Sequence, residues 1–219
     1  MPIPNLSLSD LTAVFGDLPR SPVIHRAYDH VRERLEPFLF NHVARSWVFS
    51  VKLAARRGQA LDAEVVAVST LLHDLGLTPH APGPHRFEVN GAEAARAFVR
   101  DLGFDDRRAQ LVWDSIALHA TPSIGFLKEP EVAICGRGIT LDFGGPDFAA
   151  FAPKEIASIV SALPRLDMKQ RFTGCMRHEA ETRPEATYDN LVRDFGLRYV
   201  QGYAPPSWVD QVLGGPYDE

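Results

Sequence analysis

The sequence contains little cysteine, and that scarcity limits the chemistry open to it. Its 219 residues include only two cysteines, Cys135 and Cys175, which lie far apart in the chain. This spacing suits neither a disulfide framework nor a zinc site built on a CxxC pair. We therefore interpret both cysteines as ordinary core residues.

Long apolar runs are missing as well. Hydrophobic residues make up 45% of the chain and charged residues 23%, and charges interrupt the apolar stretches well before one could span a bilayer. The first twenty residues lack the basic segment and long apolar segment of a secretory signal. We expect a cytoplasmic protein without a membrane partner.

An excess of basic residues is also absent. The net charge of -5 at pH 7 argues against sequence-independent binding of nucleic acid, because contacts with phosphates require clustered lysine and arginine. The pairs Arg56-Arg57 and Arg107-Arg108 are most simply solvated helix ends. The expected partner is a small-molecule substrate, and the choice between a monomer and a homo-oligomer stays open.

Apolar residues at helical spacing, in contrast, recur along almost the whole chain. Ser21 followed by Pro22 predicts the start of a helix running toward Phe40, which Pro37 should kink or end. Asp62 predicts the cap of a very apolar, central helix. Helices are expected over about 22–40, 41–58, 63–76, 86–103, 105–120, 131–141, 153–163, 168–181 and 188–200, with loops at 78–85 and 121–125 and a short amphipathic helix in the tail. No alternating strand pattern or repeat is evident, so we predict an all-α, single-domain helical bundle over residues 1–219.

The stretch "LLHDLG" places His73 and Asp74 side by side at the end of the apolar run. Burying such a pair is costly unless its charge is neutralised, and a cation would do so. Imidazole and carboxylate are ligands of zinc, iron and manganese. Two neighbours alone hold a metal poorly, so other helices must contribute. His42, near the start of its helix, and Asp142, at the end of "EVAICGRGITLD", are the candidates.

The order His42, His73-Asp74, Asp142 on an all-helical chain resembles the HD superfamily of metal-dependent hydrolases. Four stretches, "LLHDLGLT", "RFEVNGAEAARAF", "VWDSIALHAT" and "GITLDFGG", also look like its cyanamide-hydratase-like branch. The resemblance covers a core of about 41–145, and residues 146–219 add flanking helices and the tail. It implies one divalent metal, zinc first and iron or manganese as alternatives, bound by His42, His73, Asp74 and Asp142.

Three residues are candidates for proton transfer. Asp74 can act as a ligand or a proton acceptor. His119, in "SIALHA", matches a histidine of the resembling branch, with a helix-capping role as the alternative. Glu88 matches the pattern too and could orient a water or a ligand histidine, or it could serve the dipole of its own helix. His80 and His85 lie in a loop rich in proline and glycine, and their roles stay open.

The resemblance implies a lyase-class hydration. A divalent metal lowers the pKa of its water and supplies hydroxide, which attacks the nitrile carbon of cyanamide, while a proton from a group such as His119 completes urea. One alternative is an HD-type phosphohydrolase acting on a nucleotide, which requires cations such as Arg45 or Arg86 near the site. Arg45 is more simply the structural partner of a carboxylate. Another alternative is a non-catalytic module that senses a ligand.

Overall fold

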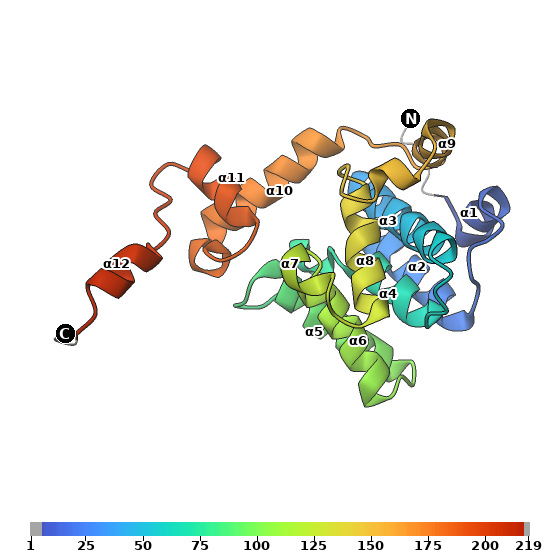
Figure 1. Ribbon diagram of the computed structural model, residues 1–219, viewed down its shortest axis with the longest axis horizontal. Coiled ribbons are helices and arrows are strands. Elements are labelled where there is room, and N and C mark those ends of the chain that lie inside the picture. The colour runs from blue at the N-terminus through green and yellow to red at the C-terminus, as the bar shows by residue number, and fades with distance from the viewer. Residues whose placement is uncertain (1–5, 217–219) are drawn as a thin grey trace. The chain divides into compact units, whose positions relative to one another are not determined.

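Helices account for the regular secondary structure of residues 6–216, the part of the chain that the computed structural model describes (Figure 1). The prediction of an all-α protein is confirmed. The chain divides into two compact units, Met1–Lys169 and Gln170–Glu219, and the prediction of a single domain over 1–219 stays a prediction. Residues 1–5, within the segment analysed above for a secretory signal, and residues 217–219 of the tail lie outside the described part. Among the described helices, none combines the length and the apolar character needed to cross a membrane.

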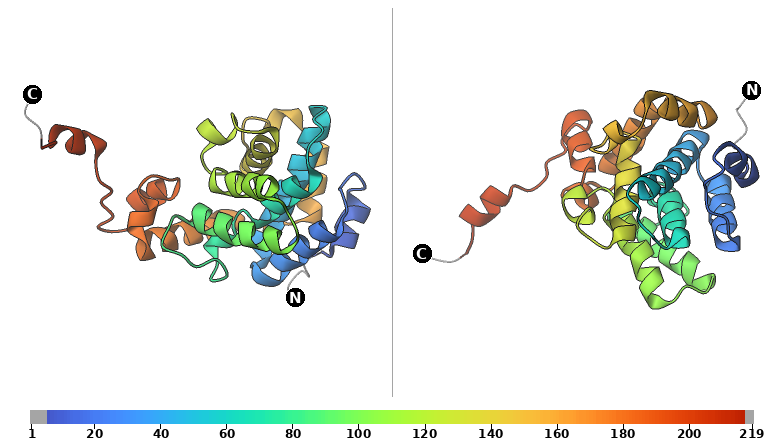
Figure 2. Two further views of the ribbon diagram at one scale, coloured as in Figure 1. Left: turned by 90° about the horizontal axis from the view of Figure 1, so that it is seen from below. Right: turned by 45° about the vertical axis from the view of Figure 1, so that its right-hand side comes forward.

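The first unit is built around one buried helix, α4 (Ala63–Leu72). Each residue of α4 from Val65 to Leu72 is buried, because the helix packs against α2, α3, α5, α6 and α8 (Figure 2). The other elements of this unit are α1 (Leu8–Val14), α2 (Pro22–Arg34), α3 (Pro37–Arg56), η1 (Leu75–Leu77), α5 (Phe87–Asp101), α6 (Asp106–Ala117), α7 (Pro122–Gly125), α8 (Pro130–Leu141), η2 (Phe148–Ala150) and α9 (Pro153–Ala162). The end of α4 therefore lies inside the unit, surrounded by other helices.

The boundary between the units falls within α10 (Met168–Thr182), whose first two residues belong to the first unit. The second unit contains the remainder of α10, followed by η3 (Pro184–Thr187), α11 (Val192–Tyr199) and α12 (Trp208–Leu213). Within it, the hydroxyls of Thr187 and Tyr203 lie 2.7 Å apart. The ring of Tyr203 occupies the space that a side chain at Gly196 would fill. The large apolar side chains of α12, in the predicted tail helix, are exposed to solvent.

Side-chain caps set the starts of several predicted helices. The hydroxyl of Ser21 accepts a hydrogen bond from the Ile24 amide at the start of α2. Asp62 and Asp105 accept backbone amides in the same way at the starts of α4 and α6. These caps satisfy amides that have no partner within the helix, and they confirm the three predicted starts.

Two prolines begin helices that were not predicted to start there. The helix from Pro22 does end before Pro37, at Arg34, as predicted, but Pro37 is also the first residue of α3. Pro122 likewise begins the short helix α7 in the segment predicted as a loop. Both corrections have one cause, because the proline ring fixes a helical φ and lacks the amide hydrogen that a first helical residue does not need.

The helix α1 was not predicted, although Ser7 and Asp10 form a reciprocal capping box at its start. Cys135 is buried, as expected of a core residue, whereas Cys175 is only half-buried.

Candidate metal centre

The chain turns sharply at the end of α4, and the turn positions the histidine-aspartate pair. α4 ends at Leu72, His73 and Asp74 follow, and η1 begins at Leu75. A Cβ atom at Gly76 would lie 1.8 Å from the carbonyl oxygen of Phe87. Glycine is therefore required for η1 to contact the first turn of α5, which closes one side of the site.

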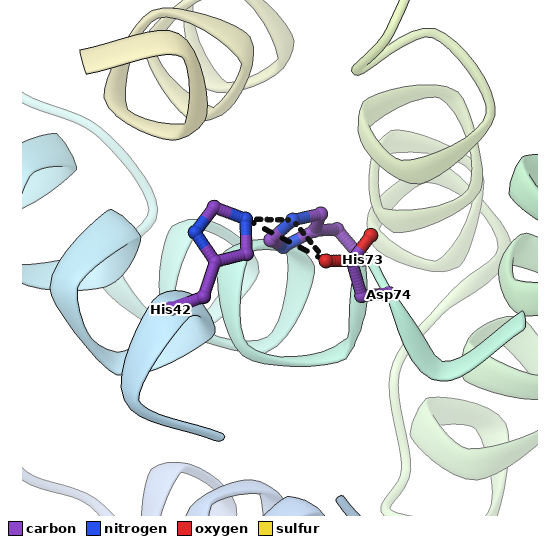
Figure 3. Close-up of side chains that lie close together, drawn as sticks. All are labelled: His42, His73 and Asp74. Atoms are coloured by element: carbon purple, nitrogen blue, oxygen red, sulfur yellow. Dashed lines mark hydrogen bonds and ion pairs between the residues drawn. The ribbon is translucent and has the colours of Figure 1, made fainter. Parts of the chain in front are cut away.

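Three ligand-type atoms converge where α3 and the end of α4 meet (Figure 3). The Nε2 atoms of His42 and His73 lie 3.1 Å apart. Oδ2 of Asp74 lies 3.5 Å from Nε2 of His42 and 3.3 Å from Nε2 of His73. All three side chains are buried. The structure thus brings together three of the four predicted metal ligands.

The hydrogen bonds of the two rings determine which nitrogens carry protons. Nδ1 of His42 lies 2.7 Å from Oδ2 of Asp142, and Nδ1 of His73 lies 2.9 Å from the carbonyl oxygen of Thr70. An ionised carboxylate and a carbonyl only accept, so each Nδ1 donates and each Nε2 of a neutral ring presents a lone pair. Oδ2 of Asp74 has no hydrogen-bond partner among the described residues. Three lone pairs therefore converge in a buried space.

The electrostatics of the cluster follow from burial and mutual contact. Burial alone would raise the pKa of Asp74, but the imidazoles of His73, His42 and His119 outweigh it and hold that pKa far below its usual range. Burial lowers the pKa of His42. Burial also acts to lower the pKa of His73, but the Asp74 carboxylate reverses this effect and raises it. The cluster therefore favours a positive charge beside Asp74.

The spacing of the three atoms suits a divalent transition metal. Ligands bound at about 2.0–2.1 Å lie roughly 2.8–3.4 Å from one another in octahedral or tetrahedral geometry. The three separations of 3.1, 3.3 and 3.5 Å are close to that range. Two imidazole nitrogens and one carboxylate oxygen suit zinc, iron and manganese alike.

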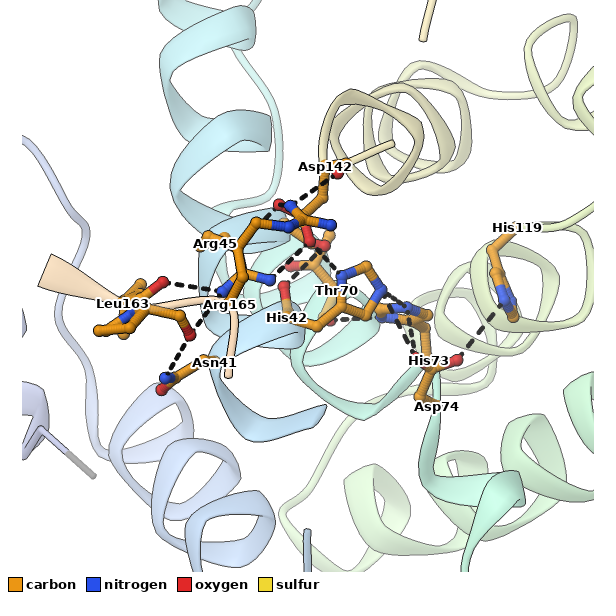
Figure 4. A network of polar contacts seen from close by, with 12 residues as sticks. Asn41, His42, Arg45, Thr70, His73, Asp74, His119, Asp142, Leu163 and Arg165 are labelled. Carbon is orange, nitrogen blue, oxygen red and sulfur yellow. Dashed lines mark hydrogen bonds and ion pairs between the residues drawn. The ribbon is translucent and has the colours of Figure 1, made fainter. Parts of the chain in front are cut away.

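Asp142 lies on the other side of His42 (Figure 4). It follows the last residue of α8, and Oδ2 accepts from Nδ1 of His42. Arg45 donates to both carboxylate oxygens, at 2.7 and 2.8 Å. Burial acts to raise the pKa of Asp142, but the hydrogen bonds from Arg45 and His42 hold it well below its usual range. The predicted pairing of Arg45 with a carboxylate is confirmed, whereas the predicted ligand role of Asp142 stays a prediction.

His119 lies beside the cluster, just after α6. Its Nδ1 donates to the carbonyl oxygen of Ile116 at 2.7 Å, so Nε2 is an acceptor. Nε2 lies 3.9 Å from Oδ1 of Asp74, and the His119 ring packs edge-on to that of His73. Burial, followed by the nearby charge of His73, lowers the pKa of His119 to about 3. The structure therefore brings His119 to the predicted site as a neutral imidazole.

Glu88 is buried in the first turn of α5, where Nη2 of Arg86 lies 2.7 Å from Oε1 of Glu88. The neighbouring Phe87 packs against the ring of His119, so this turn adjoins the site. The catalytic role of Glu88 stays a prediction. His80 and His85 are exposed in the loop before α5.

Sequence reasoning missed three polar partners of the site. The carbonyl oxygens of Thr70 and Ile116 set the tautomers of His73 and His119, and backbone carbonyls leave no signal in the residue types. Arg165 donates to Oδ1 of Asp142 at 2.9 Å. Its segment, "LPRLD", resembles no motif, so the fold alone reveals this contact.

A helical core with a buried His-His-Asp cluster defines a candidate metal-binding protein of the all-α class. The family model for the HD domain matches residues 39–188, and the chain belongs to the HD domain family. Comparison with curated proteins gave no match. HD domains are typically metal-dependent hydrolases that bind divalent metals, and this supports an enzymatic role at that coarse level.

Proposed function

We propose that this protein is an enzyme that adds water to a small molecule with the help of one divalent metal ion, with zinc as the first candidate. The observation that carries the proposal is the convergence of Nε2 of His42, Nε2 of His73 and Oδ2 of Asp74, which present three lone pairs to one another when both rings are neutral. These three atoms would hold the ion. A divalent ion at such a site lowers the pKa of a coordinated water toward neutrality.

Two further atoms beside the cluster can accept a proton. Oδ1 of Asp74 and Nε2 of His119 face each other at 3.9 Å, and both are acceptors in the tautomer that Ile116 fixes. A water molecule that donates to one or both of them is oriented for attack and can lose its proton there. His119 can return a proton that it has taken up, acting then as an acid, and the lowered pKa of His119 favours this return.

Cyanamide is our first candidate substrate. Its nitrile carbon accepts the water oxygen, the water loses one proton to His119 or Asp74, and the nitrile nitrogen gains one proton. The product of these steps is isourea, which tautomerises to urea. The net reaction adds one water to cyanamide and has no leaving group, so it requires no side chain that binds a leaving phosphate. This choice of substrate rests on the resemblance of the motifs to the cyanamide-hydratase-like branch.

Arg45 does not favour the phosphohydrolase alternative. A phosphoester substrate requires cationic side chains that can reach its oxygens. Arg45 is fully buried, and its guanidinium donates to Asp142 and to the carbonyl oxygen of Leu163. It is therefore occupied as a structural group. The remaining candidate, Arg86, is hydrogen-bonded to Glu88.

The test is urea formation from cyanamide by zinc-loaded protein, compared with His73→Ala and Asp74→Ala. His80→Ala is the matched control, because His80 is an exposed loop histidine. Urea from the parent and the control, and none from the two cluster variants, would support the proposal. Bound zinc without urea excludes cyanamide. Phosphate released from nucleoside monophosphates would then indicate the phosphohydrolase, and no turnover of either compound would favour the ligand-sensing module.

A further inference from the structure

The carboxylate of Asp142 is surrounded by hydrogen-bond donors. Oδ1 accepts from Nε of Arg45 at 2.7 Å and from Nη1 of Arg165 at 2.9 Å, while Oδ2 accepts from Nδ1 of His42 at 2.7 Å and from Nη2 of Arg45 at 2.8 Å. A carboxylate offers about four acceptor sites. These four donors use them, so the carboxylate has little capacity left for a metal ion.

The charges around Asp142 lead to the same conclusion. Two guanidinium groups, those of Arg45 and Arg165, face the one carboxylate of Asp142. When His42 is neutral, these three charged side chains together carry a net positive charge. A cation gains nothing by approaching a carboxylate that is already over-neutralised. Asp74, in contrast, faces only imidazoles, and its Oδ2 has no hydrogen-bond partner among the described residues.

The direction of the His42 ring separates the two carboxylates. Nδ1 of His42 faces Asp142, and Nε2 faces His73 and Asp74 (Figure 4). The two nitrogens lie on opposite sides of the imidazole. A carboxylate hydrogen-bonded to the outer nitrogen of a ligand histidine fixes its tautomer and raises its basicity.

We propose that Asp142 is a positioning residue, which acts on the metal only through His42, and that Arg45 and Arg165 hold its carboxylate in place. The inference rests on the proposed metal site. It assigns Nε2 of His42 as the atom that binds metal and Nδ1 as the atom that carries the proton. It also gives the two arginines one role, because without them Asp142 would be a buried anion with a single imidazole partner.

The loop after α9 is built to support this arrangement. Nη1 of Arg45 donates to the carbonyl oxygen of Leu163 at 2.8 Å, and Asn41 donates to that of Pro164 at 2.8 Å. Leu166 and Asp167 then adopt φ values of 49° and 60°. A non-glycine residue in this region of φ is strained and persists only where its surroundings impose it. The strained turn directly follows Arg165, the residue that reaches Asp142.

The test is nitrogen-15 NMR of histidine-labelled protein loaded with cadmium-113, with the His42 signals assigned from a His42→Gln variant. We expect a cadmium coupling to Nε2 of His42 and a downfield proton on Nδ1. In Asp142→Asn that proton signal should shift strongly, while one equivalent of cadmium still binds to Nε2 with an affinity reduced about 10–100-fold. Arg45→Lys is the milder second variant, and Arg100→Lys, at an exposed arginine, is the control.

The outcomes separate this inference from the proposed function. Cadmium coupled to Nδ1 of His42, or Asp142→Asn losing the metal as completely as Asp74→Ala, would overturn the positioning role and leave the metal site standing. A parent protein that binds no cadmium would overturn both.

Discussion

The Nε2 atoms of His42 and His73 lie 3.1 Å apart, although neither can donate to the other in the tautomers that Asp142 and Thr70 fix. Two lone pairs at this distance repel, and Oδ2 of Asp74 adds a third. A cation placed between them converts the repulsion into attraction. The cluster is therefore a place where binding and folding are coupled.

The first prediction concerns stability in the presence of zinc. At a free zinc concentration of about 100 times Kd, the free energy of unfolding should rise by about 2.7 kcal/mol, because the ion binds the folded chain. Urea unfolding with zinc and with a chelator measures the difference. His73→Ala should show no such rise, whereas His80→Ala and His85→Ala, at exposed histidines, should match the parent. Equal stabilisation of His73→Ala would place the metal elsewhere.

The second prediction concerns the buried pair of Arg45 and Asp142. Arg45→Met should lower the free energy of unfolding by about 3 kcal/mol, since it removes a bidentate partner from a buried carboxylate. The double variant with Asp142→Asn should lose less than the sum of the two single losses, by about 0.5–3 kcal/mol. Urea unfolding of the four proteins gives the coupling energy. Strict additivity would mean that the two side chains do not stabilise each other.

Much of the fold could be predicted because its causes are local. Apolar residues at helical spacing and the caps at Ser21, Asp62 and Asp105 mark where helices begin. The start of α3 at Pro37 was not predicted, because the same ring that breaks a helix interior also suits a first helical position. The choice between these two roles depends on where the preceding helix ends, which short-range pattern does not reveal.

The site was predictable only in part. His73 and Asp74 stand out because they form a polar pair in an apolar run, and His42 joins them across the fold. Which nitrogen of His42 faces the cluster depends on Asp142, a residue that directly follows another helix, α8. Residue order alone cannot distinguish a ligand from the partner of a ligand, because both are carboxylates at the same place in the sequence.

The third prediction concerns acid sensitivity at the start of α4. Arg108, which the sequence suggested to be solvated, binds both Asp62 and Glu64 at 2.7 Å. Burial acts to raise the pKa of Asp62, but hydrogen bonds from Arg108 and backbone amides lower it below 3.8; the bond from Arg108 lowers that of Glu64 below 4.5. A carboxyl group whose pKa is lower in the folded than in the unfolded protein stabilises the fold at pH values above its unfolded pKa. This stabilisation is lost as the pH falls through the pKa of the folded protein.

The stability difference between the parent and Arg108→Met should therefore stay constant from pH 7 to about pH 5 and shrink below about pH 4. The part of this difference that comes from the charges should be no more than about 1 kcal/mol, since the three side chains are partly exposed. Any loss of stacking on Phe104 adds a part that does not change with pH. Urea unfolding across this range measures both parts. A difference that grows toward acid would contradict the assignment.

The fourth prediction compares two helical glycines. A Cβ atom at Gly138 of α8 would lie 1.9 Å from the hydroxyl of Ser50 and 2.9 Å from the carbonyl oxygen of Ser46, both on α3. Gly138→Ala must push α8 away from α3 and should destabilise the protein by about 1–3 kcal/mol. A side chain at Gly174 of α10 meets nothing within 4 Å, so Gly174→Ala should stabilise by about 0.5–1 kcal/mol.

The same pair of variants tests whether the α3-α8 contact also supports the metal centre. α8 ends at Leu141, directly before Asp142, and α3 carries His42 and Arg45. A displacement of α8 lengthens the hydrogen bond from Nδ1 of His42 to Asp142, so Gly138→Ala should weaken zinc binding as well as stability, whereas Gly174→Ala should leave zinc binding unchanged. Zinc titration of the folded variants measures this. If Gly138→Ala loses stability but binds zinc as the parent does, the orientation of His42 does not depend on Asp142.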